Sequence, residues 1–134
     1  MRGRTSAGRT ALDLGLDTSY KTITAHQLLG QYHLERSQNE PALHHLTQAI
    51  ATAQTVPQEE INPAERSHQQ RMVANLYFLR SRVYRQNKHY ELSYADGQKA
   101  VDLAQSAEDE NGVHYYREQL KILAHHAGRE LSGP

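Results

Sequence analysis

The sequence predicts an all-α domain of about five helices, because apolar residues recur at intervals of three and four in successive segments. Gly and Pro are nearly absent from these segments. The chain has 134 residues, which corresponds to a single domain. Only 37% of the residues are hydrophobic, so we expect a thin core.

Composition excludes several classes of protein. Fifteen basic residues balance fifteen acidic ones, so the overall charge recruits neither nucleic acid nor an anionic membrane. The absence of cysteine excludes a disulfide scaffold, a thiolate metal site and a cysteine nucleophile. No apolar run approaches the roughly 20 residues that span a bilayer, so no membrane partner is expected.

Residues 1–17 are expected to form a flexible basic tail, since they are rich in Gly, Ser, Thr and Arg and contain no acidic residue before Asp13. Their composition also resembles that of an organellar targeting segment, a minor alternative to the cytoplasmic location that we expect. Leu12, Leu14 and Leu16 alternate with a period of two, which suits a strand or a docking motif. A plain disordered tail is the favoured interpretation.

Residues 18–128 are expected to form the helical domain. Thr18 or Ser19 can cap the first helix, which ends near residue 36. The second helix begins near residue 40. Asn62 and Pro63 form a cap and first-turn pair for a long third helix that ends near residue 87. A fourth helix covers residues 90–106, and a fifth begins near residue 110 and ends at Gly128, leaving residues 129–134 as a C-terminal tail.

Small residues recur with the same spacing in the two halves of the helical region. Intervals of twelve and seven residues separate the members of each set, which are Gly30, Ala42 and Ala49 in the first half and Ser81, Ser93 and Ala100 in the second. A small residue midway along one helix lets an antiparallel neighbour approach closely. We therefore expect two helical hairpins with close contacts at these six structural positions.

This pattern resembles the tetratricopeptide repeat, a helix-turn-helix unit of about 34 residues that stacks into a solenoid. The resemblance implies a short right-handed solenoid with one repeat over residues 20–55, a second over 63–106 and a capping helix over 110–128. Arg80 stands where the family usually has Leu, and Gly97 where it usually has an aromatic residue. Two repeats fall below the usual minimum of about three, so a homo-oligomer or a larger complex is expected.

In such a solenoid the first helix of each repeat lines a concave groove. The resemblance therefore implies a partner-binding groove made of Gln27, Gln31, Arg71, Asn75, Phe78, Arg82 and Arg85. Phe78 would anchor a protein or peptide segment, and the arginines would pair with its acidic groups. From Arg66 to Tyr90 the chain has six Arg or Lys residues and no acidic one. A solvated helix face with one exposed Phe is the equally weighted alternative.

Other features are assigned structural roles. Arg80 lies in the middle of the apolar side of its helix, where a paired role is favoured over recognition. Family members that bind chaperone C-termini carry a clamp of Lys and Asn, whereas Gln27 and Gln31 stand at the corresponding places without the Lys. Most of the nine histidines are expected at the surface or at its boundary. The adjacent pairs point about 100° apart along a helix, and His26 and His33 share a face without a nearby Cys or Asp, so no metal site is expected.

These features favour a non-catalytic protein-interaction module or scaffold that binds a segment, acidic by preference, in its groove. The alternative is a structural subunit that docks through its end helix or outer surface. RNA binding is a third and less favoured hypothesis, because Tyr77 and Tyr84 lie on the side opposite the arginines. No phosphate loop and no nucleophile arrangement is found, so neither an enzyme nor a cofactor is expected.

Overall fold

The computed structural model describes residues 14–132, with side chains described for residues 14–127. The predicted tail and its targeting alternative fall mostly on residues 1–13, as does Leu12 of the leucine pattern, and these lie outside the described residues. Within the described range the protein is entirely α-helical, as predicted. Its five helices are α1 (Asp17–Glu35), α2 (Asn39–Ala53), α3 (Pro63–Gln86), α4 (Tyr90–Ser106) and α5 (Glu110–Ser132).

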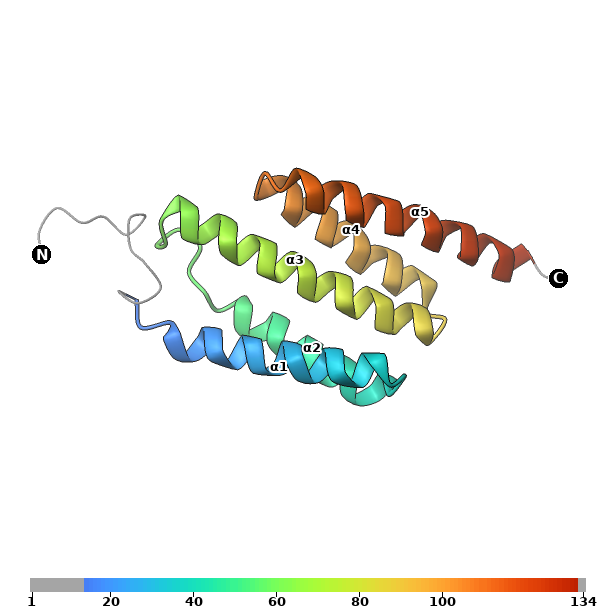
Figure 1. Ribbon diagram of the computed structural model, residues 1–134, viewed down its shortest axis with the longest axis horizontal. Helices are drawn as coiled ribbons and strands as arrows, with labels where there is room; N and C mark the ends of the chain where they lie inside the picture. Colours follow the sequence, from blue (N-terminus) through green and yellow to red (C-terminus); the bar gives the residue numbers. More distant parts are fainter. Residues whose placement is uncertain (1–13, 133–134) are drawn as a thin grey trace, which may run out of the picture.

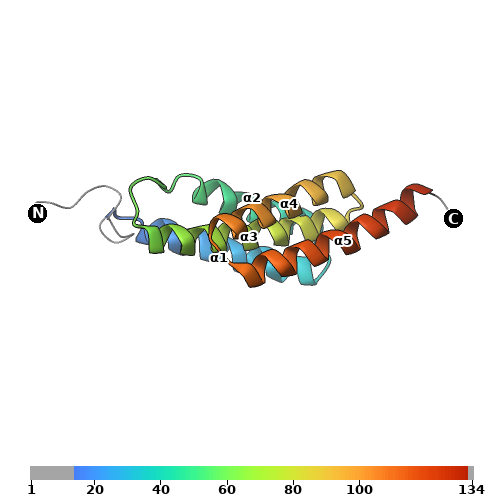
Figure 2. The same cartoon turned by 90° about the horizontal axis from the view of Figure 1, so that it is seen from above.

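Each helix packs on the one that follows it in the chain, so the helices lie side by side in sequence order from α1 to α5 (Figure 1). Figure 2 shows two layers, with α2 and α4 on one side and α1, α3 and α5 on the other. Within the second layer α3 contacts both α1 and α5. The central helix α3 therefore touches every other element.

The helix ends confirm one predicted cap and correct two other predictions. Asn62 caps α3, because its side-chain oxygen accepts a hydrogen bond from the Glu65 backbone N–H at 2.8 Å. The predicted Thr18 or Ser19 cap of α1 is wrong: the helix begins at Asp17 and no side chain caps it. Asp17 instead places a negative charge in the first turn, where the helix dipole favours it.

The predicted end of the fifth helix at Gly128 is also wrong, since α5 continues to Ser132. Glycine ends a helix when its backbone adopts a left-handed conformation, but the same residue is tolerated inside a helix at a cost of about 1 kcal/mol. The following residues, Arg129 and Glu130, are good helix formers. Helix propensity beyond the glycine therefore outweighs the local stop signal.

Three of the four connections use one turn geometry. Ser37, Lys88 and Glu108 each lie two residues beyond the end of a helix and have φ near +60° (56°, 62° and 57°), in the left-handed region. In the first turn the Gln38 backbone N–H donates to the His33 carbonyl at 2.9 Å, as in a Schellman motif. The equivalent bonds join His89 to Tyr84 and Asp109 to Ala104. This turn reverses the chain, so that the following helix packs against the helix before it.

The predicted close contacts at small residues are present, since all six repeat positions are buried. In the first hairpin Leu46 of α2 lies over Gly30 of α1, so that a Cβ at Gly30 would stand 2.6 Å from the Leu46 Cγ. In the second hairpin the Ser81 hydroxyl donates to the Ser93 carbonyl at 2.8 Å, and the Ser93 hydroxyl donates to the Ser81 carbonyl at 2.7 Å. Both hairpins therefore close at the same place, by packing in one and by hydrogen bonding in the other.

Gly97 plays the same part between α4 and α5. A Cβ at this position would lie 2.6 Å from the Leu120 Cδ2 of α5. Gly97 thus makes room for an apolar side chain of α5.

The long connection between α2 and α3 is held by polar contacts. The Arg66 guanidinium donates to the carbonyls of Gln58 and Ile61 at 2.9 and 3.0 Å. Gln69 is buried and donates to the Ala53 carbonyl at 3.1 Å. Arg66 belongs to the basic stretch of residues 66–90, but its guanidinium stabilises this loop.

Replacing Ala49 with Leu is expected to lower the free energy of unfolding by roughly 1 to 3 kcal/mol, because Ala49 is fully buried and the larger side chain overpacks the contact. Urea unfolding measures the change. Ala51→Leu is the matched control, since Ala51 lies two residues away on the exposed side of α2. Equal urea midpoints for the two variants would show that Ala49 does not lie in a packed interface.

Candidate interaction surface

The residues predicted to bind a partner lie on the layer of α1, α3 and α5. Gln27 and Gln31 are half-buried on α1, and neither makes a hydrogen bond among the described residues. Arg71 on α3 is exposed, and Asn75, Arg82 and Arg85 are half-buried. These side chains are accessible, whereas Phe78, the seventh member of the set, is not.

The expectation that Phe78 is an exposed anchor is corrected by its burial. Its side chain is 8% exposed and belongs to a core cluster with Ala74 and Ala100. Its ring lies 5.4 Å from the ring of Tyr115 and 5.1 Å from that of Tyr116, both on α5. Phe78 lies on the polar side of α3, as the helical periodicity predicts. At Phe78, however, α5 covers this side.

The exposed aromatic residue of this face is Tyr115, which the sequence analysis did not single out. It is 50% exposed and meets the ring of Phe78 edge-on, at an interplanar angle of 67°. Its neighbour Tyr116 belongs to an apolar stripe of α5, because it lies four and seven residues before Leu120 and Leu123. Two adjacent tyrosines on a helix point about 100° apart, so one of them had to leave the stripe. This divergence was the signal in the sequence that could have identified Tyr115 as exposed.

Arg82 and Arg85 line a narrow pocket where α3 meets α5. The pocket also includes Phe78, Tyr116 and Gln119, and no acidic side chain lines it. Its volume is about 10 Å³, too small for a side chain to enter. Among the described residues Arg71, Arg82 and Arg85 make neither a hydrogen bond nor an ion pair. The guanidinium groups are therefore available to an acidic group that lies across the pocket rather than inside it.

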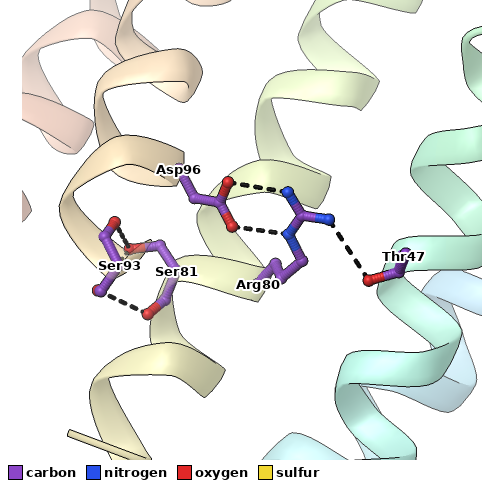
Figure 3. Close-up of polar contacts among 5 residues, drawn as sticks. All are labelled: Thr47, Arg80, Ser81, Ser93 and Asp96. Carbon is purple, nitrogen blue, oxygen red and sulfur yellow. Dashed lines mark hydrogen bonds and ion pairs between the residues drawn. The ribbon is translucent and has the colours of Figure 1, made fainter. Parts of the chain in front are cut away.

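Arg80 is paired, as predicted. Figure 3 shows its guanidinium between α2 and α4, where the Nε and Nη2 atoms donate to the two carboxylate oxygens of Asp96 at 2.7 and 2.9 Å. The Nη1 atom donates to the Thr47 hydroxyl at 3.4 Å. The rings of Tyr77 and Tyr84 lie 5.4 and 5.8 Å away. Arg80 therefore links α2, α3 and α4.

This ion pair is a fixed part of the fold. Asp96 is buried, and its hydrogen bond is the main reason that the pKa of Arg80 is raised above its usual value. Two parallel hydrogen bonds between planar groups fix geometry as well as energy. Because its donors are already engaged, Arg80 is not available to a partner in the way that Arg82 and Arg85 are.

The histidines are more organised than predicted. His26 of α1 and His45 of α2 meet with their Nδ1 atoms 2.9 Å apart. The ring of His33 lies parallel to that of His45 at 5.8 Å, and His44 contacts His45 edge-on. Within the described part of the chain no group of three or more His, Cys, Asp or Glu side chains has the geometry to hold a metal ion. The sequence showed that His26 and His33 share a face of α1 but not that α2 brings His45 to it.

No helix of the described residues is long and apolar enough to cross a membrane. Comparisons with protein-family models, with curated proteins and with solved structures find no match to this chain. The assignment of function therefore depends on the surface itself.

Replacing Phe78 with Ala is expected to lower the free energy of unfolding by about 3 to 5 kcal/mol, the usual cost of truncating a core Phe. Tyr115→Ala is the control, because it removes the aromatic contact from the exposed side and is expected to cost about 0.5 to 1.5 kcal/mol. Urea unfolding of both variants measures the difference. A Phe78→Ala variant as stable as the wild type would show that Phe78 is not a core residue and would agree with an exposed position in a groove.

Proposed function

We propose that this protein is a non-catalytic interaction module that binds an acidic segment of a partner protein on the face formed by α1, α3 and α5. The observation that carries the proposal is the pair of unengaged arginines, Arg82 and Arg85, which line a pocket with Phe78 and Tyr116 but with no acidic side chain of the described residues. In this proposal the protein works as a cytoplasmic scaffold.

The helix arrangement supports a tetratricopeptide-like solenoid of two repeats and a cap. α1 and α3 would be the first helices of the repeats, and α5 the capping helix that extends their layer. The contacts of α3 with α1 and α5 agree with this, as do the equivalent hairpin contacts at Gly30 and Ser81. A right-handed solenoid would make this layer its concave side.

Recognition would combine charge with an aromatic contact. A guanidinium donates two parallel hydrogen bonds to a carboxylate, which fixes the orientation of the acidic group as well as its charge. Tyr115 replaces Phe78 as the exposed aromatic anchor, with Phe78 and Tyr116 beneath it as a rigid support. The amides of Gln27 and Gln31 can donate to and accept from the backbone of an extended segment. Arg71 and Asn75 would continue the polar surface along α3.

An exposed apolar strip on α1 favours a second candidate function, that of a structural subunit. Leu28 is 62% exposed, and Leu29 and Tyr32 on the same helix are also exposed. A strip of this kind on the end helix would suit docking on another subunit, or on a second copy of the chain. RNA binding is the least favoured candidate, because Tyr77 and Tyr84 surround Arg80 rather than Arg82 and Arg85.

A displayed library of random peptides tests the proposal. We expect the wild-type protein to enrich peptides rich in Asp and Glu, and the Arg82→Ala/Arg85→Ala variant to bind them at least about tenfold more weakly, because each charged hydrogen bond contributes about 1.5 to 3 kcal/mol. Fluorescence anisotropy of one enriched peptide measures the affinity. Circular dichroism checks that the variant is folded.

Leu28→Ala/Tyr32→Ala is the matched control on the neighbouring helix and is expected to bind like the wild type. A loss of binding in this variant alone would move the interaction to the outer strip of α1 and support the structural subunit. Enrichment without acidic residues would contradict the arginine site. Tight binding of a polyuridine oligonucleotide that weakens steeply with salt would favour RNA instead.

A further inference from the structure

Four histidines gather between α1 and α2, outside the proposed binding face. His26 and His33 come from α1, and His44 and His45 come from α2. His45 is the centre of the cluster, because its ring contacts all three others at centroid distances between 5.1 and 5.8 Å. The cluster therefore joins the two helices of the first hairpin through imidazole rings.

The bond between His26 and His45 depends on protonation. Two Nδ1 atoms at 2.9 Å make a hydrogen bond only when one carries a proton and the other presents a lone pair. When both rings are cationic, two N–H donors face each other and the bond is lost. His33 differs, because its Nδ1 lies 2.7 Å from the Gln38 side-chain oxygen and can donate to it whether the ring is neutral or charged.

No carboxylate compensates a positive charge at the centre of the cluster. Burial lowers the pKa of His45, followed by the charges of His26, His44 and His33, and no acidic group takes part. On the α1 side Arg36 lies over the Tyr32 ring that contacts His33.

The charged groups of α3 do not neutralise positive charge in the histidine cluster. Arg80 is the α3 cation that reaches α2, where it meets Thr47 and is already paired with Asp96. Glu65 of α3 acts on Tyr20 in the first turn of α1. An acidic solution therefore adds positive charge to a cluster whose charged and titratable neighbours do not neutralise it.

We propose that these four histidines form an acid-sensitive latch that holds α1 against α2 while the rings are neutral and loosens when they are protonated. The rings of His26 and His33 on α1 each meet the ring of His45 on α2, so repulsion between them acts across the first hairpin. The second hairpin closes through Ser81 and Ser93, whose hydroxyls do not titrate. Acid would thus weaken one hairpin and spare the other.

The direction of the pH effect follows from the His45 pKa. A histidine with a lowered pKa in the folded state binds fewer protons there than in the unfolded chain. The stability that it contributes is complete above the unfolded pKa of about 6.5 and declines as pH falls through that value toward the lower folded pKa. The latch is therefore closed at neutral pH and opens in mild acid.

Thermal unfolding at about pH 7.5 and pH 5.5 tests the latch. We expect the unfolding midpoint of the wild type to fall from the higher to the lower pH, because the unfolded chain binds more protons at His45 than the folded protein does. His26→Gln/His45→Gln replaces the pair with neutral side chains and is expected to lose at least half of that fall. His125→Gln/His126→Gln is the matched control, since these adjacent exposed rings contact each other on α5, and it should keep the full wild-type fall.

Two measurements on the wild type keep the proposal testable if the double variant does not fold. In an NMR titration of assigned ring protons, His45 is expected to titrate below the ordinary histidine range. Hydrogen exchange, corrected for intrinsic rates, should show that α1 amides lose protection at the lower pH while α3 and α4 amides near Ser81 and Ser93 keep theirs.

The latch is overturned if His26→Gln/His45→Gln keeps the full wild-type pH dependence, or if the His125→Gln/His126→Gln control loses it. An ordinary titration of His45, or equal loss of protection in both hairpins, also overturns it. None of these measurements uses a partner, so their outcome is independent of the proposed function.

Discussion

The close approach of antiparallel helices at small residues is the constraint on which the rest of the structure depends. Gly30 receives Leu46, Ser81 and Ser93 exchange hydrogen bonds, and Gly97 receives Leu120. Each contact sits where a larger side chain would separate two helices. The small residues let the helix backbones approach, and buried aliphatic side chains such as Leu46 and Leu120 fill the space beside them.

The position of the proposed binding face depends on the contact between Gly97 and Leu120. Because Leu120 packs α5 against Gly97, the turn of α5 before Leu120 brings Tyr115 and Tyr116 over Phe78. That covering gives the face an aromatic floor, while Arg82 and Arg85 stay accessible at its edge. Arg80, two residues before Arg82 on the same helix, turns to the other layer and pairs with Asp96 (Figure 3). In the proposed function, Arg82 and Arg85 of α3 serve recognition, whereas Arg80 of the same helix serves the structure.

Local features of the sequence predicted the fold well. Periodicity located the five helices, Asn62 marked the start of α3, and the spacing of Gly30, Ala42 and Ala49 located buried contacts. These signals are local because they depend on residues within one helix or one hairpin. The right-handed solenoid and its partner remain proposals, because they depend on how hairpins stack and on molecules outside the chain.

The site was less predictable, for the same physical reason. Periodicity showed that Phe78 lies away from the apolar side of α3, but whether a side is exposed depends on which helix crosses it. The histidine cluster likewise depends on the register between α1 and α2, which brings His45 to a face already occupied by His26 and His33. Gly128 shows that a glycine near the end of a predicted helix does not always end it, since α5 continues to Ser132. Single-helix patterns do not contain this information.

Disulfide trapping tests the close approach most directly, because the natural chain has no cysteine. The Ser81 and Ser93 hydroxyl oxygens lie 3.0 Å apart, so a Ser81→Cys/Ser93→Cys variant is expected to form an intramolecular disulfide under mild oxidation. Ser81→Cys/Ala95→Cys, with its second thiol on the exposed side of α4, should remain reduced. Mass spectrometry under native conditions distinguishes the two states. Equal cross-linking of both variants, or none in the first, would contradict the register on which this structure depends.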